Sequence, residues 1–130
     1  MPYGRYLHTM IHVADIEKSI DFYTRIMGMS ILRQGSMPAE GRSNAFLGYA
    51  PEADAAAIEL TAYAGRSAYE KGTAFGHLAL EFQDVRSACA EIEAAGGNVT
   101  RQPFSISNGK TIAFVVDPDG YEIEMVQPAA

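Results

Sequence analysis

The segment Asp-Pro-Asp-Gly-Tyr-Glu-Ile-Glu-Met-Val, residues 117–126, decides the fold and carries the most informative acidic side chain. Asp-Pro-Asp-Gly is typical of a tight turn, because proline presets φ and glycine accepts a positive φ. An apolar segment, residues 111–116, precedes the turn, and the segment after it alternates, with Ile123 and Met125 on one face and Glu124 on the other. The pattern predicts a hairpin in which Glu124 either faces solvent or points into a cavity.

Length and composition limit the class of protein. With 130 residues, 48% of them hydrophobic, we expect one domain, residues 1–130, with a substantial core. The net charge of −6, with no basic stripe, argues against nucleic acid as a partner. No apolar run approaches the roughly 20 residues of a membrane span, and no secretory signal pattern is present. The single cysteine, Cys89, excludes an internal disulfide and fits the reducing cytoplasm, so we expect a cytoplasmic protein.

Apolar periodicity divides the rest of the chain into short elements. Asp15 is placed to cap the first helix, and glycines follow the ends of both helices. Residues 35–42 are expected to form a loop, and residues 65–73, which are polar and bounded by glycine, a linker. The expected strands are 7–13, 30–34, 43–49, 56–63, 76–82, 99–102, 111–116 and 122–126, and the expected helices are 17–27 and 84–95.

The two halves of the chain repeat one order of motifs. Each half is predicted to form a β-α-β-β-β module with one histidine in its first strand and one glutamate in its last. The histidines are His8 and His77, and the glutamates are Glu59 and Glu124; an Ala-Phe pair also recurs in both halves. This arrangement indicates an internal duplication. We expect an α+β fold with module 1 at residues 1–65 and module 2 at residues 74–130.

Two matched histidines and two matched carboxylates favour a metal site over isolated structural residues. The first and last strands of each module can place a polar side chain on one concave face, while the helix covers the opposite, apolar face. Imidazole and carboxylate ligands, without thiolate, suit Ni²⁺, Co²⁺, Zn²⁺, Fe²⁺ or Mn²⁺. Four protein ligands would leave two octahedral positions open, as a catalytic metal requires.

Motifs along nearly the whole chain resemble those of glyoxalase I (lactoylglutathione lyase), in the vicinal oxygen chelate superfamily. The motifs are Leu7-His8-Thr9-Met10-Ile11, Ser19-Ile20-Asp21-Phe22-Tyr23-Thr24, Met27-Gly28-Met29, Phe46-Leu47-Gly48-Tyr49, Ile58-Glu59-Leu60-Thr61, Gly76-His77-Leu78-Ala79 and Asp117-Pro118-Asp119-Gly120-Tyr121 with Glu124. The resemblance implies paired βαβββ modules with a metal cavity inside curved mixed sheets. It also implies a homodimer whose sites each take His8 and Glu59 from one chain and His77 and Glu124 from the other.

The resemblance implies a reaction as well. The hemithioacetal of a 2-oxoaldehyde such as methylglyoxal and a thiol such as glutathione would be isomerised to a 2-hydroxyacyl thioester. The compact connection between the modules is similar to that of members that favour nickel or cobalt, with zinc, iron and manganese left open. The metal would stabilise the developing negative charge, and Glu124 would move the proton from C1 to C2, with Glu59 as its counterpart.

Two positions depart from the glyoxalase I pattern at the thiol-binding end. His12 stands where that pattern has arginine, and Tyr63 stands where it has asparagine. Together with Met10, these are the candidate substrate-binding residues. Histidine does not provide a permanent bidentate clamp for a carboxylate, so the identity of the thiol stays open. Replacement positive charge could come from cations expected in loops, namely Arg42, Arg66, Arg101 and Lys110.

Two other functions stay open. One is a different enzyme of the superfamily, such as an epimerase or an extradiol-type dioxygenase. A dioxygenase would be expected to use two histidines and one carboxylate, so a fourth ligand at Glu59 argues against it. The other is a non-catalytic, metal-free binding or resistance protein of the same fold, which would sequester a small toxic compound. The presence of all four ligand residues argues against this second function.

Overall fold

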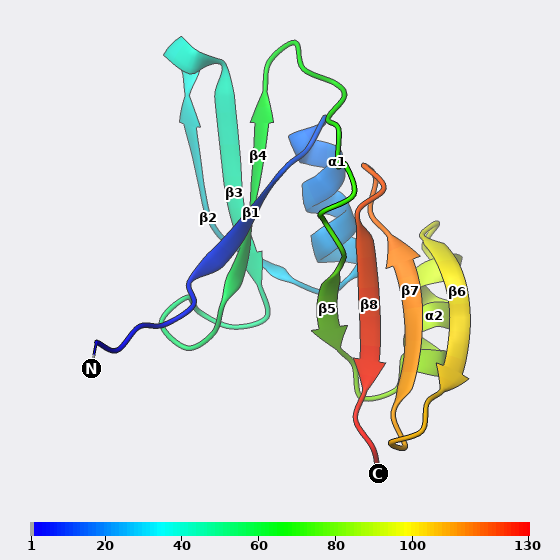
Figure 1. Cartoon of the computed structure of the whole chain (residues 1–130). Coiled ribbons are helices and arrows are strands. Elements are labelled where there is room, and N and C mark those ends of the chain that lie inside the picture. The colour runs from blue at the N-terminus through cyan, green and yellow to red at the C-terminus, as the bar shows by residue number, and fades with distance from the viewer. Residues whose placement is uncertain (1) are drawn as a thin grey trace. The chain divides into compact units, whose positions relative to one another are not determined.

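The structure is a computed structural model that describes residues 2–130. The chain divides into two compact units, the first ending at Glu70 and the second running from Lys71 to Ala130. Each unit contains one four-stranded mixed sheet and follows the order β-α-β-β-β (Figure 1). The predicted α+β class and the two βαβββ modules are therefore confirmed.

The first unit has the strand order β1-β4-β3-β2. The outer strand β1 pairs in parallel with β4, and the other neighbours are antiparallel. Its elements are β1 (His8–His12), α1 (Ile16–Asp21), the π-helical turn η1 (Phe22–Ile26), β2 (Ser30–Met37), the short 3₁₀ turn η2 (Pro38–Glu40), β3 (Arg42–Gly48) and β4 (Ala57–Tyr63).

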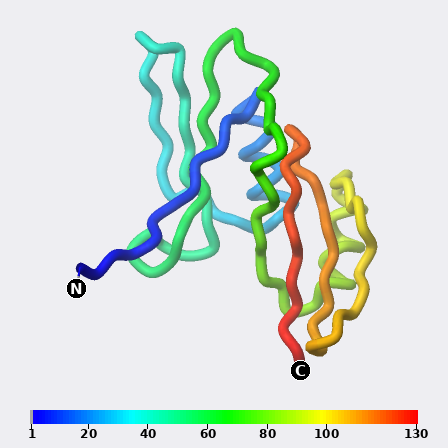
Figure 2. The backbone as a smooth tube through the Cα atoms, in the orientation of Figure 1, coloured from blue at the N-terminus to red at the C-terminus, as the bar shows by residue number. Residues whose placement is uncertain are grey.

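The second unit repeats this topology with the strand order β5-β8-β7-β6. The pair β5 and β8 is parallel, and the remaining pairs are antiparallel. Its elements are β5 (Leu78–Glu81), α2 (Val85–Ala94), β6 (Asn98–Ser105), β7 (Thr111–Val116) and β8 (Glu122–Gln127). Figure 2 follows the backbone through the first unit and then the second, coloured from the N-terminus to the C-terminus.

In each unit the helix covers one face of its own sheet, and this face forms the core. In the first unit α1 packs against β3 and β4, and Leu47 of β3 and Leu60 of β4 are fully buried. In the second unit α2 packs against β6, β7 and β8, and Cys89 contacts Met125 with 3.9 Å between the sulfur atoms. Because strand side chains alternate, the opposite face of each sheet receives the polar residues of the same strands.

The first helix differs from the prediction of one α-helix from Glu17 to Met27. The α-helix ends at Asp21, and the next turn is π-helical, with the Met27 N–H donating to the Phe22 carbonyl over 2.9 Å. The Thr24 hydroxyl donates to a backbone carbonyl one turn earlier, which competes with regular helix bonding. The wider turn accompanies burial of two consecutive rings, Phe22 and Tyr23. The apolar stripe alone does not show this widening.

Two strands are longer than predicted. β2 continues to Met37 and β3 begins at Arg42, so the expected loop at residues 35–42 was wrong for residues 35–37 and for Arg42. Gly35 pairs with Asn44 there, and a Cβ at Gly35 would lie 2.8 Å from the Asn44 Oδ1. β6 continues through Pro103 to Ser105, which an edge strand permits because proline need not donate to a neighbour.

Each unit also contains a register shift at the same place. In β2 the shift lies between Ile31 and Arg33, after which Arg33 pairs with Phe46. In β6 one shift lies between Val99 and Arg101, after which Arg101 pairs with Phe114. Equivalent irregularities in the second strand of both modules extend the internal repeat from sequence motifs to backbone geometry.

Candidate metal centre

The first histidine–glutamate pair lies on the face of its sheet that α1 does not cover. His8 and Met10 of β1 are opposite Ala57 and Glu59 of β4, so His8 and Glu59 are diagonal neighbours on one face. His8 Nε2 lies 3.2 Å from Glu59 Oε1. The two side chains are 31% and 16% exposed, which makes them accessible to a small ligand while partly sheltered from water.

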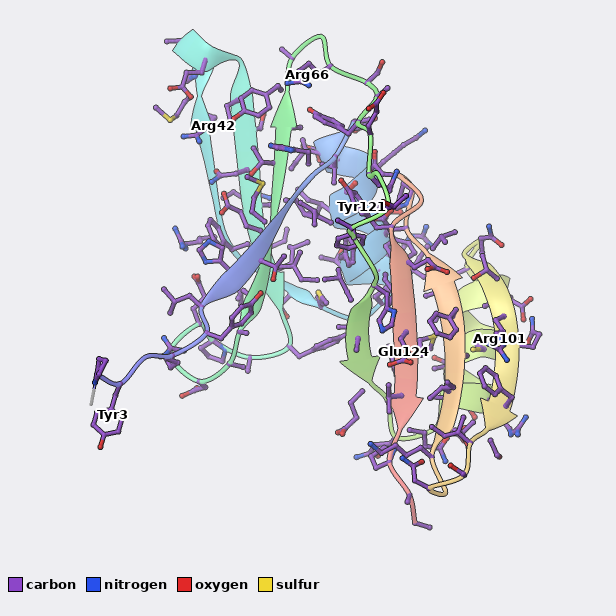
Figure 3. All side chains as sticks on the ribbon, viewed as in Figure 1. Tyr3, Arg42, Arg66, Arg101, Tyr121 and Glu124 are labelled. Atoms are coloured by element: carbon purple, nitrogen blue, oxygen red, sulfur yellow. The ribbon has the colours of Figure 1, made fainter. Side chains whose placement is uncertain are left out.

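The second pair repeats the arrangement in the other unit. His77 immediately precedes β5, and Glu124 lies in β8 (Figure 3). His77 Nε2 lies 3.7 Å from Glu124 Oε1, and the side chains are 40% and 24% exposed. The parallel pairing of the first and last strands therefore brings a histidine to a glutamate in both modules.

A phenylalanine supports the histidine in each pair. Phe46 is the cross-strand partner of Glu59, and its ring meets the His8 ring edge to face at 5.1 Å and 89°. Phe114 is the partner of Glu124 and meets His77 in the same manner at 5.7 Å and 79°. The recurring Ala-Phe pair was the sequence signal for these residues, although the sequence did not indicate their contact with the histidines.

The surroundings of the two carboxylates differ. Glu59 Oε2 accepts a hydrogen bond from Asn44 Nδ2 at 3.1 Å and one from Thr61 Oγ1 at 3.3 Å. In the second unit the equivalent cross-strand positions are Ile112 and Val126, which have no side-chain donor. Within residues 2–130, the Glu124 carboxylate faces His77 Nε2 and accepts no side-chain hydrogen bond. Sequence analysis identified both glutamates but not the donors that distinguish them.

The distances within the pairs test whether the residues fit a divalent cation. With metal–nitrogen and metal–oxygen bonds of about 2.1 Å, neighbouring ligand atoms lie about 3.0 Å apart in an octahedron and about 3.4 Å apart in a tetrahedron. The first pair, at 3.2 Å, lies inside this range, and the second, at 3.7 Å, lies slightly outside it. The first pair thus has the spacing of two ligands of one cation, and the second pair would have to draw closer to reach it.

Across the described part of the chain, residues 2–130, no group of three or more His, Cys, Asp or Glu side chains gathers closely enough to hold a metal. The four predicted ligands occur as two pairs, one in each unit. A four-ligand centre requires one pair of each kind to meet, and the sharing of sites between two chains stays a prediction. The ligand set itself stays a prediction.

The candidate substrate-binding residues share the face of Glu59. Met10 and His12 of β1 are opposite Glu59 and Thr61, and Met10 is 43% exposed. The His12 ring is 5.8 Å from the Tyr63 ring and stacks on Tyr69 at 5.1 Å and 14°. Tyr69 was missed in the sequence because it lies in the irregular segment after β4.

Two of the four cations predicted to lie in loops are in strands. Arg42 begins β3 and Arg101 is in β6, whereas Arg66 and Lys110 lie outside the regular elements (Figure 3). Arg66 lies over the Tyr69 ring at 5.0 Å. Arg101 lines a cavity of about 410 Å³ beside His77, together with Thr100, Phe114 and Glu122. A second cavity, of about 500 Å³, lies at the end of β4 and is lined by Tyr63 and Arg66 among others.

Comparison with known proteins decides the family. Residues 5–125 match the model of the Glyoxalase/Bleomycin resistance protein/Dioxygenase superfamily. The chain belongs to the glyoxalase superfamily. The resemblance to glyoxalase I seen in the sequence motifs is thereby confirmed.

Members of this superfamily with similar sequences are named lactoylglutathione lyases. The chain is 50% identical to a probable lactoylglutathione lyase of Vibrio parahaemolyticus, over 98% of this chain and 93% of that protein. It is also 50% identical to lactoylglutathione lyase of Escherichia coli, over 95% of this chain and 92% of that protein. Both relatives are therefore matched over nearly their full length.

Solved glyoxalase I structures share the fold. Glyoxalase I from Zea mays superimposes with a TM-score of 0.92 at 42% identity, covering 97% of this chain and 45% of the maize chain. This chain thus spans about half the length of that protein. The trypanothione-dependent glyoxalase I of Leishmania major gives a TM-score of 0.85 at 38% identity, covering 96% of this chain and 87% of the Leishmania chain.

None of the helices in residues 2–130 is long and apolar enough to cross a membrane.

Proposed function

We propose that the chain is a metal-dependent glyoxalase I-type lyase. It isomerises the hemithioacetal of a 2-oxoaldehyde such as methylglyoxal and a thiol to a 2-hydroxyacyl thioester. The observation that carries this proposal is the histidine–glutamate pair that recurs in both units, in each case on the sheet face that the helix does not cover. The name lactoylglutathione lyase of relatives at 50% identity supports the same reaction and glutathione as the thiol.

The metal ligands of this proposal are His8, Glu59, His77 and Glu124. Two chains form a homodimer in which each centre takes one pair from each chain, as the resemblance to glyoxalase I implies. The modules, residues 1–65 and 74–130, act together as one domain. When bound, a divalent cation, with nickel or cobalt favoured, supplies positive charge that stabilises the oxyanion developing on the substrate.

The two carboxylates have different tasks. Glu124 is the base that takes the proton from C1 of the hemithioacetal and returns it to C2. Its carboxylate faces His77, and Ile112 and Val126 stand where the first unit has the donors Asn44 and Thr61. No hydrogen bond among the described residues therefore holds it in one orientation, which suits a base that moves between the two carbon atoms. Glu59 is held by two donors and serves as the fixed ligand. The substrate thereby meets one anchored and one movable carboxylate.

Other residues on the Glu59 face of the first sheet orient the substrate. Met10, His12 and Tyr63 bind it at the thiol end, where the stacked rings of His12 and Tyr69 provide a flat, partly polar wall. Arg66, beside this wall, supplies positive charge for a carboxylate of the thiol. We propose a cytoplasmic location, where glutathione is abundant and the free thiol of Cys89 stays reduced.

The deciding experiment is an assay of purified protein with methylglyoxal and glutathione, and in parallel with other thiols. The protein is first stripped with a chelator and then reloaded with Ni²⁺, Co²⁺ or Zn²⁺. Turnover should vanish on stripping and return on reloading. Light scattering of the same samples should give the mass of a dimer. A metal-loaded dimer that forms no thioester with any of the thiols would refute the proposal.

A further inference from the structure

Asn44 contacts a proposed metal ligand at the carboxylate oxygen that does not face His8. It lies in β3 opposite Thr61, and its Nδ2 donates to Glu59 Oε2 over 3.1 Å. Since an ionised carboxylate only accepts, the amide must present its nitrogen to Glu59. Thr61, which is 1% exposed, donates its hydroxyl to the same oxygen over 3.3 Å. Two donors therefore fix Oε2 and leave Oε1 facing His8.

The neighbouring strand leaves room for this amide. Gly35 of β2 is the cross-strand partner of Asn44. A Cβ at Gly35 would lie 2.8 Å from Asn44 Oδ1, closer than two such atoms can approach, so any side chain there would displace the amide. Glycine at position 35 thus leaves the space in which the Asn44 amide reaches Glu59.

The second unit shows that the fold does not require this support. Ile112 occupies the position of Asn44, and Val126 that of Thr61, in strands with the same pairing. The sheet forms with apolar residues there, and Glu124 still reaches His77. The polar pair beside Glu59 therefore serves the carboxylate, not the sheet.

We propose that Asn44 is a positioning residue that holds the Glu59 carboxylate in the orientation a metal ligand needs. The inference rests on the proposed function, since it assumes that Glu59 binds the cation. Groups that hydrogen-bond a metal ligand from outside commonly change metal affinity by about 10- to 100-fold when they are removed. Asn44 is the main group of this kind on Glu59, because its contact is the shorter of the two.

The test is calorimetric titration of metal-free protein with Ni²⁺, for the parent chain, Asn44→Leu and the matched control Ile112→Val. Asn44→Leu preserves size and removes the donor, so we expect its Kd for Ni²⁺ to rise about tenfold or more. The control should stay within about twofold of the parent. With Co²⁺ the visible absorption spectrum of Asn44→Leu should also change, because an unanchored Glu59 alters the ligand geometry.

Two further variants keep the test decisive if Asn44→Leu folds poorly. Gly35→Ala leaves Asn44 in the chain but crowds its amide, and should weaken Ni²⁺ binding in the same direction. Asn44→Ser restores a donor and should recover part of the affinity. Folded variants that bind Ni²⁺ as tightly as the parent would overturn the inference and leave the proposed function intact. A parent chain that binds no divalent metal would instead overturn the proposed function and this inference with it.

Discussion

Replacing Glu124 by glutamine should stop the reaction while leaving the fold and most of the metal binding in place. The side chain is 24% exposed and its only described polar contact is with His77, so a glutamine of equal size fits without a new unsatisfied group. The amide oxygen can take the place of Oε1. The amide cannot accept a proton as a base, and the loss of a general base costs about 10²- to 10⁴-fold in rate. This corresponds to about 3–5 kcal/mol in activation free energy.

The same substitution at Glu59 should have a different effect. Oε2 of Glu59 accepts from Asn44 and Thr61, so a glutamine must keep its carbonyl oxygen on that side. Its NH₂ group then faces His8, 3.2 Å away in the native pair, and a neutral amide nitrogen does not coordinate a metal, because its lone pair is delocalised into the carbonyl group. Glu59→Gln is therefore expected to lose metal affinity first and activity as a consequence.

The comparison needs two measurements on each variant. Metal affinity is measured by titration of the metal-free protein with Ni²⁺, and turnover is measured at saturating Ni²⁺ with methylglyoxal and glutathione. Glu124→Gln should show near-parental affinity with little turnover, and Glu59→Gln a clearly weaker affinity. Turnover within tenfold of the parent in Glu124→Gln would refute its role as base. Equal losses of metal affinity in the two variants would refute the division into an anchored and a movable carboxylate.

Three further predictions concern stability and reactivity. Leu60→Ala removes a fully buried side chain from β4 and should lower the free energy of unfolding by about 2–5 kcal/mol in urea titrations, whereas no loss would contradict the assigned core. Burial raises the pKa of the Cys89 thiol, so iodoacetamide at neutral pH should label the unfolded chain much faster than the folded one. Hydrogen bonds from Ser87 lower the pKa of the Asp84 carboxyl at the start of α2. The ionised carboxylate therefore stabilises the folded chain above the pKa of about 4 that Asp has in the unfolded chain. This stabilisation is lost as the pH falls through the lower pKa of the folded state. Asp84→Asn should therefore lower the melting temperature at pH 7. The melting temperature of this variant should also decrease less than that of the parent between about pH 5 and about pH 2, and an equal decrease in both would contradict this.

The sequence predicted the parts of the fold that periodicity controls. The alternation around Glu59 and Glu124 placed both on the face opposite the core, and the spacing of the histidines revealed the duplication. The parallel pairing of first and last strands then brought each histidine to its glutamate, at 3.2 and 3.7 Å. These features depend on local pattern and strand order, which a single sequence can carry.

The sequence did not predict features that depend on contacts between distant strands. Gly35 looked like a loop residue, because its role is visible only when β3 places Asn44 opposite it. Asn44 itself gave no signal, since its partner Glu59 is 15 residues away and the bond depends on strand register. The π-helical turn at Phe22 likewise depends on how a buried ring packs, which periodicity does not report.

The register shift in β2 has a consequence for how this protein can change over time. Leu32 is the extra residue between the pairs Ile31–Leu47 and Arg33–Phe46. If the strand kept Leu32 but paired without the shift, Leu32 would lie opposite Phe46, Arg33 would turn to the core side, and Gly35 would no longer lie beside Asn44. Deleting Leu32 would instead leave Arg33 opposite Phe46 and Gly35 opposite Asn44, because the remaining residues keep their partners. In the second module Thr100 is the extra residue of β6, so the same point of that strand can also lose a residue while the later pairs stay in place. An insertion or deletion of one codon at these two points therefore need not exchange the faces of the strand.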